Sequence, residues 1–213
     1  MSETQSTILV LGGTGLVGRH VVDQALEAGW LPTLHHRGNR TLYPELEHLL
    51  GDRDDQGGVA SLVGRPFDVV VDTSARRPRH VEQLSATLGS VEHYTFISSI
   101  SVYSDASTLR QDETAPVHAW AEPEAPIQSA ASYGGLKRLS ELAAERCFGR
   151  ALILRPGLIV GPGDSTDRFD WWVRHLAAGD TLEVPEPKGR LVQVIDAMDL
   201  ATFTISSAKA GLT

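Results

Sequence analysis

The stretch ILVLGGTGLVG, residues Ile8–Gly18, decides how the rest of the chain is interpreted. Four apolar residues typical of a strand run into three glycines spaced Gly-x-x-Gly-x-x-Gly, and a helical pattern of apolar residues follows. A helix that begins beside a sheet edge presents unpaired N–H groups and the positive end of its dipole, which suits a pyrophosphate. We therefore expect a dinucleotide-binding turn, with an ordinary glycine-rich turn as the alternative.

Each glycine of this turn has its own expected role. Gly12 permits the tight turn, Gly15 lets the backbone approach the phosphates, and Gly18 lets the helix pack closely on the strand. The turn follows a strand and opens a helix near the start of the sequence, which is the context that such a motif requires.

Length and composition indicate a globular protein with one domain and part of a second. The chain has 213 residues, a formal net charge of -8 and a single cysteine, Cys147. The acidic balance counts against a broad nucleic-acid surface, because phosphate binding needs clustered positive charge. The lone cysteine excludes an internal disulfide, and its simplest role is that of a small apolar residue on a helix. Without a long apolar run or a signal-peptide layout, we expect a cytoplasmic protein that does not enter a membrane.

Strand and helix patterns alternate along most of the sequence. Strands are expected at 8–11, 31–35, 67–72, 94–98 and 151–155, and at the end of segment 45–50. Helices are expected at 15–28 and 80–88, and a third helix, which Ser132 would cap, carries Tyr133 to Ala143. Such alternation predicts an α/β fold with a doubly wound parallel sheet, Rossmann-like, in the strand order 3-2-1-4-5-6.

The sequence changes character after residue 160. We expect a dinucleotide-binding domain over 1–160 and a partial substrate-binding region over 161–213. The second part holds an amphipathic helix near 169–173, a strand at 191–195 and a last helix from Ile195 nearly to Thr213. The last strand and helix could return to the sheet, the strand as its seventh member. The large aromatic residues here could line a substrate cleft, or they could be core or a dimer contact.

The end of the second strand bears on the choice of cofactor. An Asp or Glu there would bind the ribose 2′-hydroxyl and favour NAD, but the sequence has His35, His36 and Arg37. A guanidinium suits a 2′-phosphate, so we expect NADP, held by Arg37 and secondarily by Arg40, with NAD as the alternative. Both arginines could instead be solvated loop residues. The histidines lack metal-type spacing, and we expect no metal site.

Small and acidic residues follow two other strands. Asp52, after the third strand, could accept from the adenine amino group or could be a turn residue. Thr73, Ser74 and Ala75 follow the fourth strand, where small side chains let the chain pass under a cofactor. In open α/β sheets, ligands bind beyond the carboxyl ends of the strands, where these residues are expected.

Tyr133 and Lys137 form the candidate catalytic pair. Four residues apart on a helix, they project from one face, and an ammonium near a phenol lowers the pKa of the tyrosine. Tyr133 would then be a general acid/base for a substrate oxygen, and Ser99 would hydrogen-bond the same oxygen. Lys137 could also bind the ribose hydroxyls, and the cofactor would exchange a hydride with the substrate carbon. The alternative is an ordinary pair on a helix surface.

Four motifs in sequence order carry a resemblance to a known family. They are Gly12–Gly18, Ser98–Tyr103, Tyr133–Lys137, and Leu154–Gly157 with Gly161-Pro162-Gly163. Together they resemble an extended short-chain dehydrogenase/reductase, the NAD(P)-dependent epimerase/dehydratase family. The likeness extends over nearly the whole chain.

This resemblance implies roles for particular residues. The catalytic residues would be Ser99, Tyr133 and Lys137. The residues that would bind the cofactor are Gly12, Thr14, Gly15, Leu16, Val17, Arg37, Asp52, Arg53, Thr73, Ser74, Ala75, Lys137 and Pro156, with Asp52-Arg53 at the adenine and Pro156 beside the nicotinamide. The family also implies a homodimer formed through the long helices after the fourth and fifth strands.

Two departures and one competing function accompany the resemblance. Family members usually continue for on the order of a hundred residues more, so the substrate region is partial, and Tyr103 precedes Ser104 where glycine is usual. We expect an oxidoreductase, or an epimerase/dehydratase, acting on a sugar nucleotide or a small carbonyl compound. The alternative is a non-catalytic, dinucleotide-binding regulatory or RNA-interacting relative, because segments 37–39 and 51–53 resemble the chloroplast stem-loop-binding members.

Overall fold

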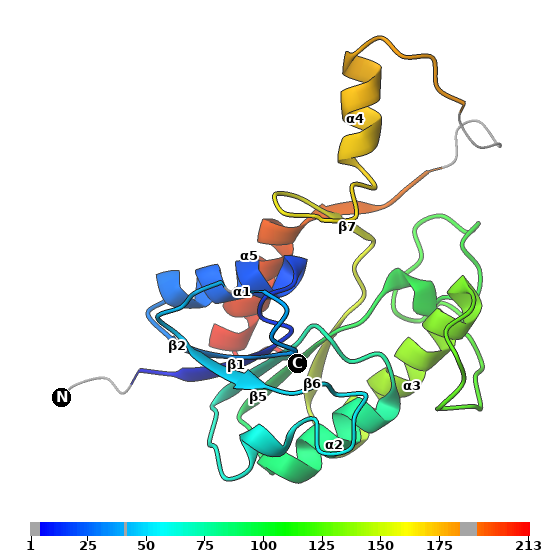
Figure 1. Cartoon of the computed structure of the whole chain (residues 1–213). Coiled ribbons are helices and arrows are strands. Elements are labelled where there is room, and N and C mark those ends of the chain that lie inside the picture. Colours follow the sequence, from blue (N-terminus) through cyan, green and yellow to red (C-terminus); the bar gives the residue numbers. More distant parts are fainter. Residues whose placement is uncertain (1–4, 41, 184–190) are drawn as a thin grey trace.

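Six short segments pair into one parallel sheet in the computed structural model, which describes residues 5–40, 42–183 and 191–213 (Figure 1). The strand order is β3-β2-β1-β4-β5-β6, which confirms the predicted order. The strands are β1 (Thr7–Leu11), β2 (Leu31–His36), β3 (Glu47–Leu50), β4 (Val69–Asp72), β5 (His93–Ile97) and β6 (Ala151–Leu154). The central strands β1 and β4 are almost entirely buried, as expected for a parallel sheet covered on both faces.

Helices cover the two faces of this sheet (Figure 1). On one face, α1 (Leu16–Glu27) packs against α5 (Ala197–Lys209), and Val10, Val21 and Leu200 share one core cluster. On the other face, α2 (Pro78–Leu88) packs against α3 (Ala130–Phe148), over the core around Leu9 and Leu11. Two 3-10 turns, Ala60–Leu62 and Ile100–Val102, complete this part. The doubly wound fold is therefore confirmed, and its ligand edge lies where the strands end.

Helix α3 begins earlier than the sequence predicts. Its N-cap is Ser129 rather than Ser132, because the Ser129 side chain accepts a hydrogen bond from the Ser132 backbone N–H at 3.1 Å. The Ser132 hydroxyl in turn accepts from the Ser129 N–H at 3.0 Å. The two serines form a reciprocal capping box, so Ser132 takes part in the cap from inside the first turn.

The strand expected at 191–195 as a possible seventh member of the main sheet corresponds to β8 and does not join that sheet. Strand β7 (Leu158–Val160) pairs in parallel with β8 (Val194–Asp196) in a separate two-stranded sheet. The last helix, α5, does return to the main sheet, where it covers the same face as α1. The predicted domain boundary at residue 160 stays a prediction. Beyond it, β8 belongs to the two-stranded sheet, whereas α5 packs on the main sheet.

Helix α4 (Asp170–Ala177) extends away from the rest of the molecule (Figure 1). None of its residues is buried, and Trp171, Val173 and Leu176 are among the exposed large apolar side chains. The aromatic residues at 169–172 are therefore not core residues in this structure. Across the described ranges, no helix has both the length and the apolar character needed to cross a membrane.

Candidate active site

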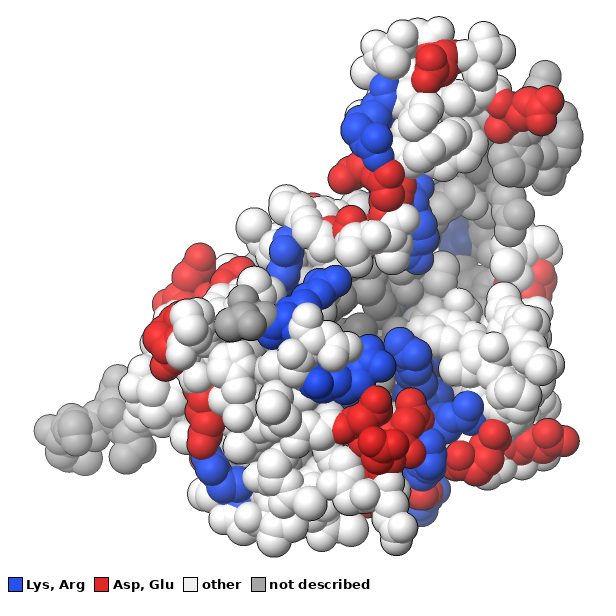
Figure 2. Space-filling view, viewed as in Figure 1, with Lys and Arg blue, Asp and Glu red and all other residues white. Residues whose placement is uncertain are grey.

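A cleft of about 780 Å³ opens at the carboxyl ends of the parallel strands. Its opposite wall comes from Ile159 on β7 and from the loop 164–168 that leads to α4. Figure 2 shows Lys and Arg side chains gathered around this hollow in the middle of the molecule. The cleft lies where ligands bind in open α/β sheets.

Most of the predicted site residues line this one cleft. They are Gly12, Thr14, Gly15, Leu16, Val17, Arg37, Asp52, Arg53, Thr73, Ser74, Ala75, Tyr133 and Lys137. Two predicted residues do not line it: the Ser99 hydroxyl donates to the Ser101 hydroxyl at 3.1 Å, and Pro156 is buried with its carbonyl accepting from the Ile100 N–H at 3.0 Å. The expected place of Pro156 beside the nicotinamide stays a prediction.

The glycine-rich turn has the geometry of an anion-binding site. Gly12 has φ +81°, and its N–H donates to the His35 carbonyl at 2.8 Å, so the turn is fixed to β2. Gly15 is the N-cap of α1, with no capping side chain and no acidic residue in the first turn. A Cβ on Gly18 would lie 2.1 Å from the Gly12 carbonyl oxygen, so helix and turn touch through backbone alone. The free N–H groups and positive dipole end at the cleft suit a pyrophosphate.

The two candidate arginines for a 2′-phosphate lie differently. Arg37 is 60% exposed and its guanidinium stands 3.8 Å from the Asp52 carboxylate. Arg40 donates from Nη1 to the Thr14 carbonyl at 3.4 Å and from Nη2 to the Ser165 hydroxyl at 3.3 Å. Arg40 therefore connects the glycine-rich turn with the opposite wall, and Arg37 keeps the freer side chain.

The neighbouring histidines form a chain of hydrogen bonds that sequence reasoning missed. Nδ1 of His36 accepts from the Gly38 N–H at 3.0 Å, which leaves the proton on Nε2 to donate to Nδ1 of His48 at 2.7 Å. His48 Nε2 then donates to the Tyr43 carbonyl at 2.8 Å. Burial, and then the neighbouring His48, lower the pKa of His36, which agrees with a neutral His36 ring. The chain fixes the loop that carries Arg37.

Arg53 has a structural role alongside its place in the cleft wall. Its guanidinium is buried, and Nη1 donates to both carboxylate oxygens of Asp72, at 2.6 and 2.8 Å. Nη2 donates to the His80 carbonyl at 2.6 Å. Burial acts to raise the pKa of Asp72, but the Arg53 charge and hydrogen bonds outweigh it, and the pKa lies below its usual value. With both terminal nitrogens used in this way, the predicted contact of Arg53 with adenine stays a prediction.

Tyr133 and Lys137 do share the cleft, but the expected effect on the Tyr133 pKa is wrong here. Tyr133 is half-buried, and burial raises the pKa of its phenol. The charges of Arg76 and Arg168 and the nearby Ser99 hydroxyl act in the opposite direction. The physical reason is burial of the phenol, while the Lys137 ammonium is bound by backbone carbonyls and is not among the charges that act on Tyr133.

The Lys137 side chain is 3% exposed and is held by backbone oxygens. Its Nζ donates to the Ile97 carbonyl at 2.6 Å and to the Ala75 carbonyl at 3.0 Å, and it lies 4.0 Å from the centre of the Phe96 ring. Burial lowers the pKa of this ammonium to about 7, against the opposing charges of Asp72 and Glu141. A lysine with such a pKa can release or take up a proton near neutral pH.

A buried carboxylate one turn beyond Lys137 stabilises the strand ends at this site. Glu141 is fully buried and accepts from the Ser98 hydroxyl at 2.6 Å, and from Arg155 Nε and Nη2 at 2.9 and 2.8 Å. Arg138 adds a bond to the same carboxylate at 2.9 Å. The network joins the ends of β5 and β6 to α3, beside Ser99. In the sequence, Glu141 stands four residues after Lys137 and so on the same face of α3, but nothing local indicates its bonds to Ser98 and Arg155.

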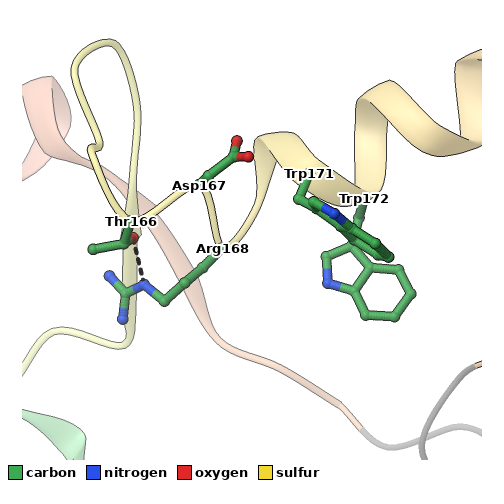
Figure 3. Close-up of a pocket in the computed structure, with 5 residues that line it drawn as sticks. All are labelled: Thr166, Asp167, Arg168, Trp171 and Trp172. Atoms are coloured by element: carbon green, nitrogen blue, oxygen red, sulfur yellow. Dashed lines mark hydrogen bonds between the residues drawn. The ribbon is translucent and has the colours of Figure 1, made fainter.

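A shallow groove of about 470 Å³ adjoins the cleft at the start of α4. Its lining consists of Thr166, Asp167, Arg168, Trp171 and Trp172 (Figure 3). The indole rings of Trp171 and Trp172 meet edge to face, with centres 5.0 Å apart, and Arg168 extends toward Thr166. Thr166 and Arg168 line the cleft as well, so the groove continues it. The aromatic residues thus lie at a surface that a ligand in the cleft can reach.

A family model and one curated protein match the sequence. The model of the NAD dependent epimerase/dehydratase family matches residues 8–211. The chloroplast stem-loop binding protein of 41 kDa b from Arabidopsis thaliana is 27% identical over 217 residues, covering 94% of this chain and 54% of that protein. The chain thus spans about half the length of this relative.

Solved structures share the fold at low sequence identity. UDP-N-acetylglucosamine 4-epimerase from Bacillus cereus is 19% identical with a TM-score of 0.71, covering 98% of this chain and 74% of that one. The Bordetella bronchiseptica enzyme WbmH, solved in complex with NAD+, is 17% identical with a TM-score of 0.74, covering 97% and 73%. Both comparisons cover nearly the whole of this chain.

Proposed function

Because the chain belongs to the NAD dependent epimerase/dehydratase family, we propose that it is an NADP-preferring oxidoreductase or epimerase/dehydratase. The observation that carries the proposal is the single cleft shared by the open N-terminus of α1, Tyr133 and Lys137. A nicotinamide bound there would supply or accept a hydride. The substrate class we favour is a sugar nucleotide or a small carbonyl compound. UDP-N-acetylglucosamine 4-epimerase, which has the same fold, is in keeping with the first of these.

The side chains of this cleft have distinct roles in the proposal. Gly12, Thr14, Gly15, Leu16 and Val17 present the turn and the first N–H groups of α1 to the cofactor phosphates. The Tyr133 hydroxyl holds or moves a proton at the substrate oxygen, and the nearby Ser99 hydroxyl favours its charged form. Because burial raises the pKa of Tyr133, its protonated form is favoured, and this suits a general acid toward a carbonyl. Lys137 holds the Ile97 and Ala75 carbonyls and keeps one N–H for a ribose hydroxyl.

The proposal is tested by turnover of the reduced or oxidised cofactor. The purified chain is mixed with NADPH and a panel of carbonyl compounds, and with NADP+ and alcohols or sugar nucleotides. Absorbance of the reduced nicotinamide and product analysis by mass spectrometry record the reaction. Turnover of at least one compound supports the proposal, whereas failure of every cofactor to bind would remove it.

Cofactor preference is expected to depend on Arg37 and Arg40. Replacing Arg37 by alanine should lower the affinity for NADP(H) by about tenfold or more, because charge-assisted hydrogen bonds to the 2′-phosphate are lost. Affinity for NAD(H), which lacks that phosphate, should change little. Replacing Arg40 by alanine should lower the affinity for both NADP(H) and NAD(H), because its guanidinium donates to the Thr14 carbonyl in the glycine-rich turn. Calorimetric titration measures all four affinities, and Arg146→Ala, an exposed change on α3, is the matched control.

One observation favours a second function, which is RNA binding. The relative from Arabidopsis thaliana is named as a stem-loop binding protein, and the arginines around the cleft could meet phosphates. The net charge of -8 opposes this, and so does the presence of Tyr133, which a pure binder does not need. Tight binding of a stem-loop RNA that weakens steeply with salt would favour the second function.

Two expectations on assembly and location stay predictions. Among the elements expected to form a homodimer, α2 and α3 pack side by side, as a shared dimer face requires. Gel filtration with light scattering measures the assembly directly. A cytoplasmic location follows from the sequence expectation alone.

A further inference from the structure

Five arginines line the cleft, and two of them differ from the rest in their contacts. Arg37 faces Asp52, Arg40 binds Thr14 and Ser165, and Arg53 binds Asp72. Arg76 has no hydrogen bond or ion pair from its guanidinium within the described ranges. Arg168 uses only Nε, which donates to the Thr166 hydroxyl at 2.8 Å (Figure 3). Both side chains are exposed to the cleft and both terminal forks are available.

Two other arginines close to Arg76 in the sequence do have hydrogen-bond or ion-pair partners. Arg77 donates to the Ala125 carbonyl at 2.7 Å, and Arg79 binds Asp54 at 2.9 Å. The acids of the cleft wall are occupied elsewhere: Asp52 by Arg37, Asp54 by Arg79 and His80, and Asp164 by the backbone and hydroxyl of Thr166. Asp164 is still close enough to Arg168 for that charge to lower its pKa. The cleft therefore has an excess of positive charge at these two side chains.

The two arginines come from different parts of the chain and line the same cleft as Tyr133. Arg76 follows β4, and Arg168 belongs to the loop before α4. Each is near enough to Tyr133 for its charge to act on the phenol. Arg37 follows β2, and β2 and β4 are two strand spacings apart, which is about 10 Å. Arg76 thus lies away from the end expected for a 2′-phosphate, and both arginines share the cleft with Tyr133.

We propose that Arg76 and Arg168 together bind an oxyanion of the substrate, a carboxylate or a phosphate, next to the oxygen that Tyr133 contacts. Guanidinium forks bind both groups in a bidentate manner, and two forks from opposite walls would fix the orientation of the molecule. The substrate would then be an anionic hydroxy or carbonyl compound, charged close to its reacting carbon. An apolar or ring-shaped remainder would lie in the groove of Trp171 and Trp172, which Arg168 joins to the cleft. The role of this oxyanion in a reaction rests on the proposed function, whereas the binding of an anion by the two arginines does not.

Anion binding tests this site without any turnover. Malonate and inorganic phosphate are titrated into the full chain by calorimetry, in chloride buffers of equal ionic strength, with saturating NADP+ and without it. Malonate represents a carboxylate substrate and phosphate a phosphorylated one. We expect one of the two to bind, and its Kd to rise by about tenfold or more in Arg76→Gln and in Arg168→Gln. Arg146→Gln, which removes the same charge from the exposed face of α3, should change the Kd by less than about twofold.

The outcomes separate the site from the proposed function. If neither probe binds, or if the protein with both Arg76→Gln and Arg168→Gln binds the probe as tightly as the unchanged chain does, the oxyanion site is wrong. If the affinity for NADP+ falls in both variants by as large a factor as the affinity for the anion, the arginines bind the cofactor, and the assignment to substrate is overturned. If NADP+ does not bind at all while anion binding still depends on both arginines, the site stands and the proposed function fails.

Discussion

Replacing Asp72 by alanine should lower the free energy of unfolding by about 3–5 kcal/mol, because it leaves the Arg53 guanidinium buried without its counter-charge. Asp72 is fully buried and also accepts from the Ser74 and Ala75 N–H groups, at 3.0 and 2.9 Å, and from the Tyr94 hydroxyl at 3.1 Å. The loss therefore includes several donors as well as the ion pair. Chemical denaturation followed by circular dichroism measures it.

Two further variants show whether the ion pair is the cause. Asp180→Ala removes a carboxylate from an exposed position and should change stability by less than about 0.5 kcal/mol. The double variant Arg53→Met with Asp72→Leu replaces the pair by apolar groups and should recover a large part of the loss. An Asp72→Ala protein as stable as the unchanged chain would contradict the structural role of the pair.

Replacing Tyr133 by phenylalanine should lower the turnover rate by about 10²–10⁴-fold, the usual contribution of a positioned acid/base. The change removes only the phenolic hydroxyl, so we expect the affinity for NADP(H) to stay within a few-fold of the original. Steady-state kinetics with whichever substrate the panel identifies gives the rate, and calorimetry gives the affinity.

A second tyrosine provides the control for this change. Tyr43→Phe also removes one phenolic hydroxyl, but that hydroxyl binds Asp23 and the Arg19 carbonyl on α1. It should lower stability slightly and leave the turnover rate nearly unchanged. If Tyr133→Phe and Tyr43→Phe are equally active, Tyr133 is not the acid/base.

Local patterns predicted the fold well because they reflect burial directly. The apolar runs at Ile8–Leu11 and Val69–Val71 are fully or almost fully buried strands, and the glycine spacing gave the turn that fixes β1 to α1. A chain with alternating strands and helices has few allowed topologies, so the strand order followed. The exception was β7 with β8, because two short apolar segments carry no signal for which sheet they join.

The site was predicted less completely because its details depend on contacts between distant segments. Arg53 and Asp72 are 19 residues apart, and nothing in either local pattern shows that they pair. Likewise, the spacing of Tyr133 and Lys137 placed both at the cleft, but the sequence does not show that Lys137 is directed to the Ile97 carbonyl. Burial at that point reversed the expected shift of the Tyr133 pKa. Spacing along a helix therefore predicted position but not electrostatics.

A crystal structure of this chain with NADP+ tests the central claim most directly, namely that one cleft brings the cofactor together with Tyr133. We predict that the pyrophosphate lies at the N-terminus of α1, that the 2′-phosphate lies by Arg37, and that the nicotinamide ring lies beside the Tyr133 hydroxyl. A cofactor bound elsewhere or in the reverse direction, or a cleft that stays empty at saturating NADP+ and NAD+, would contradict the account.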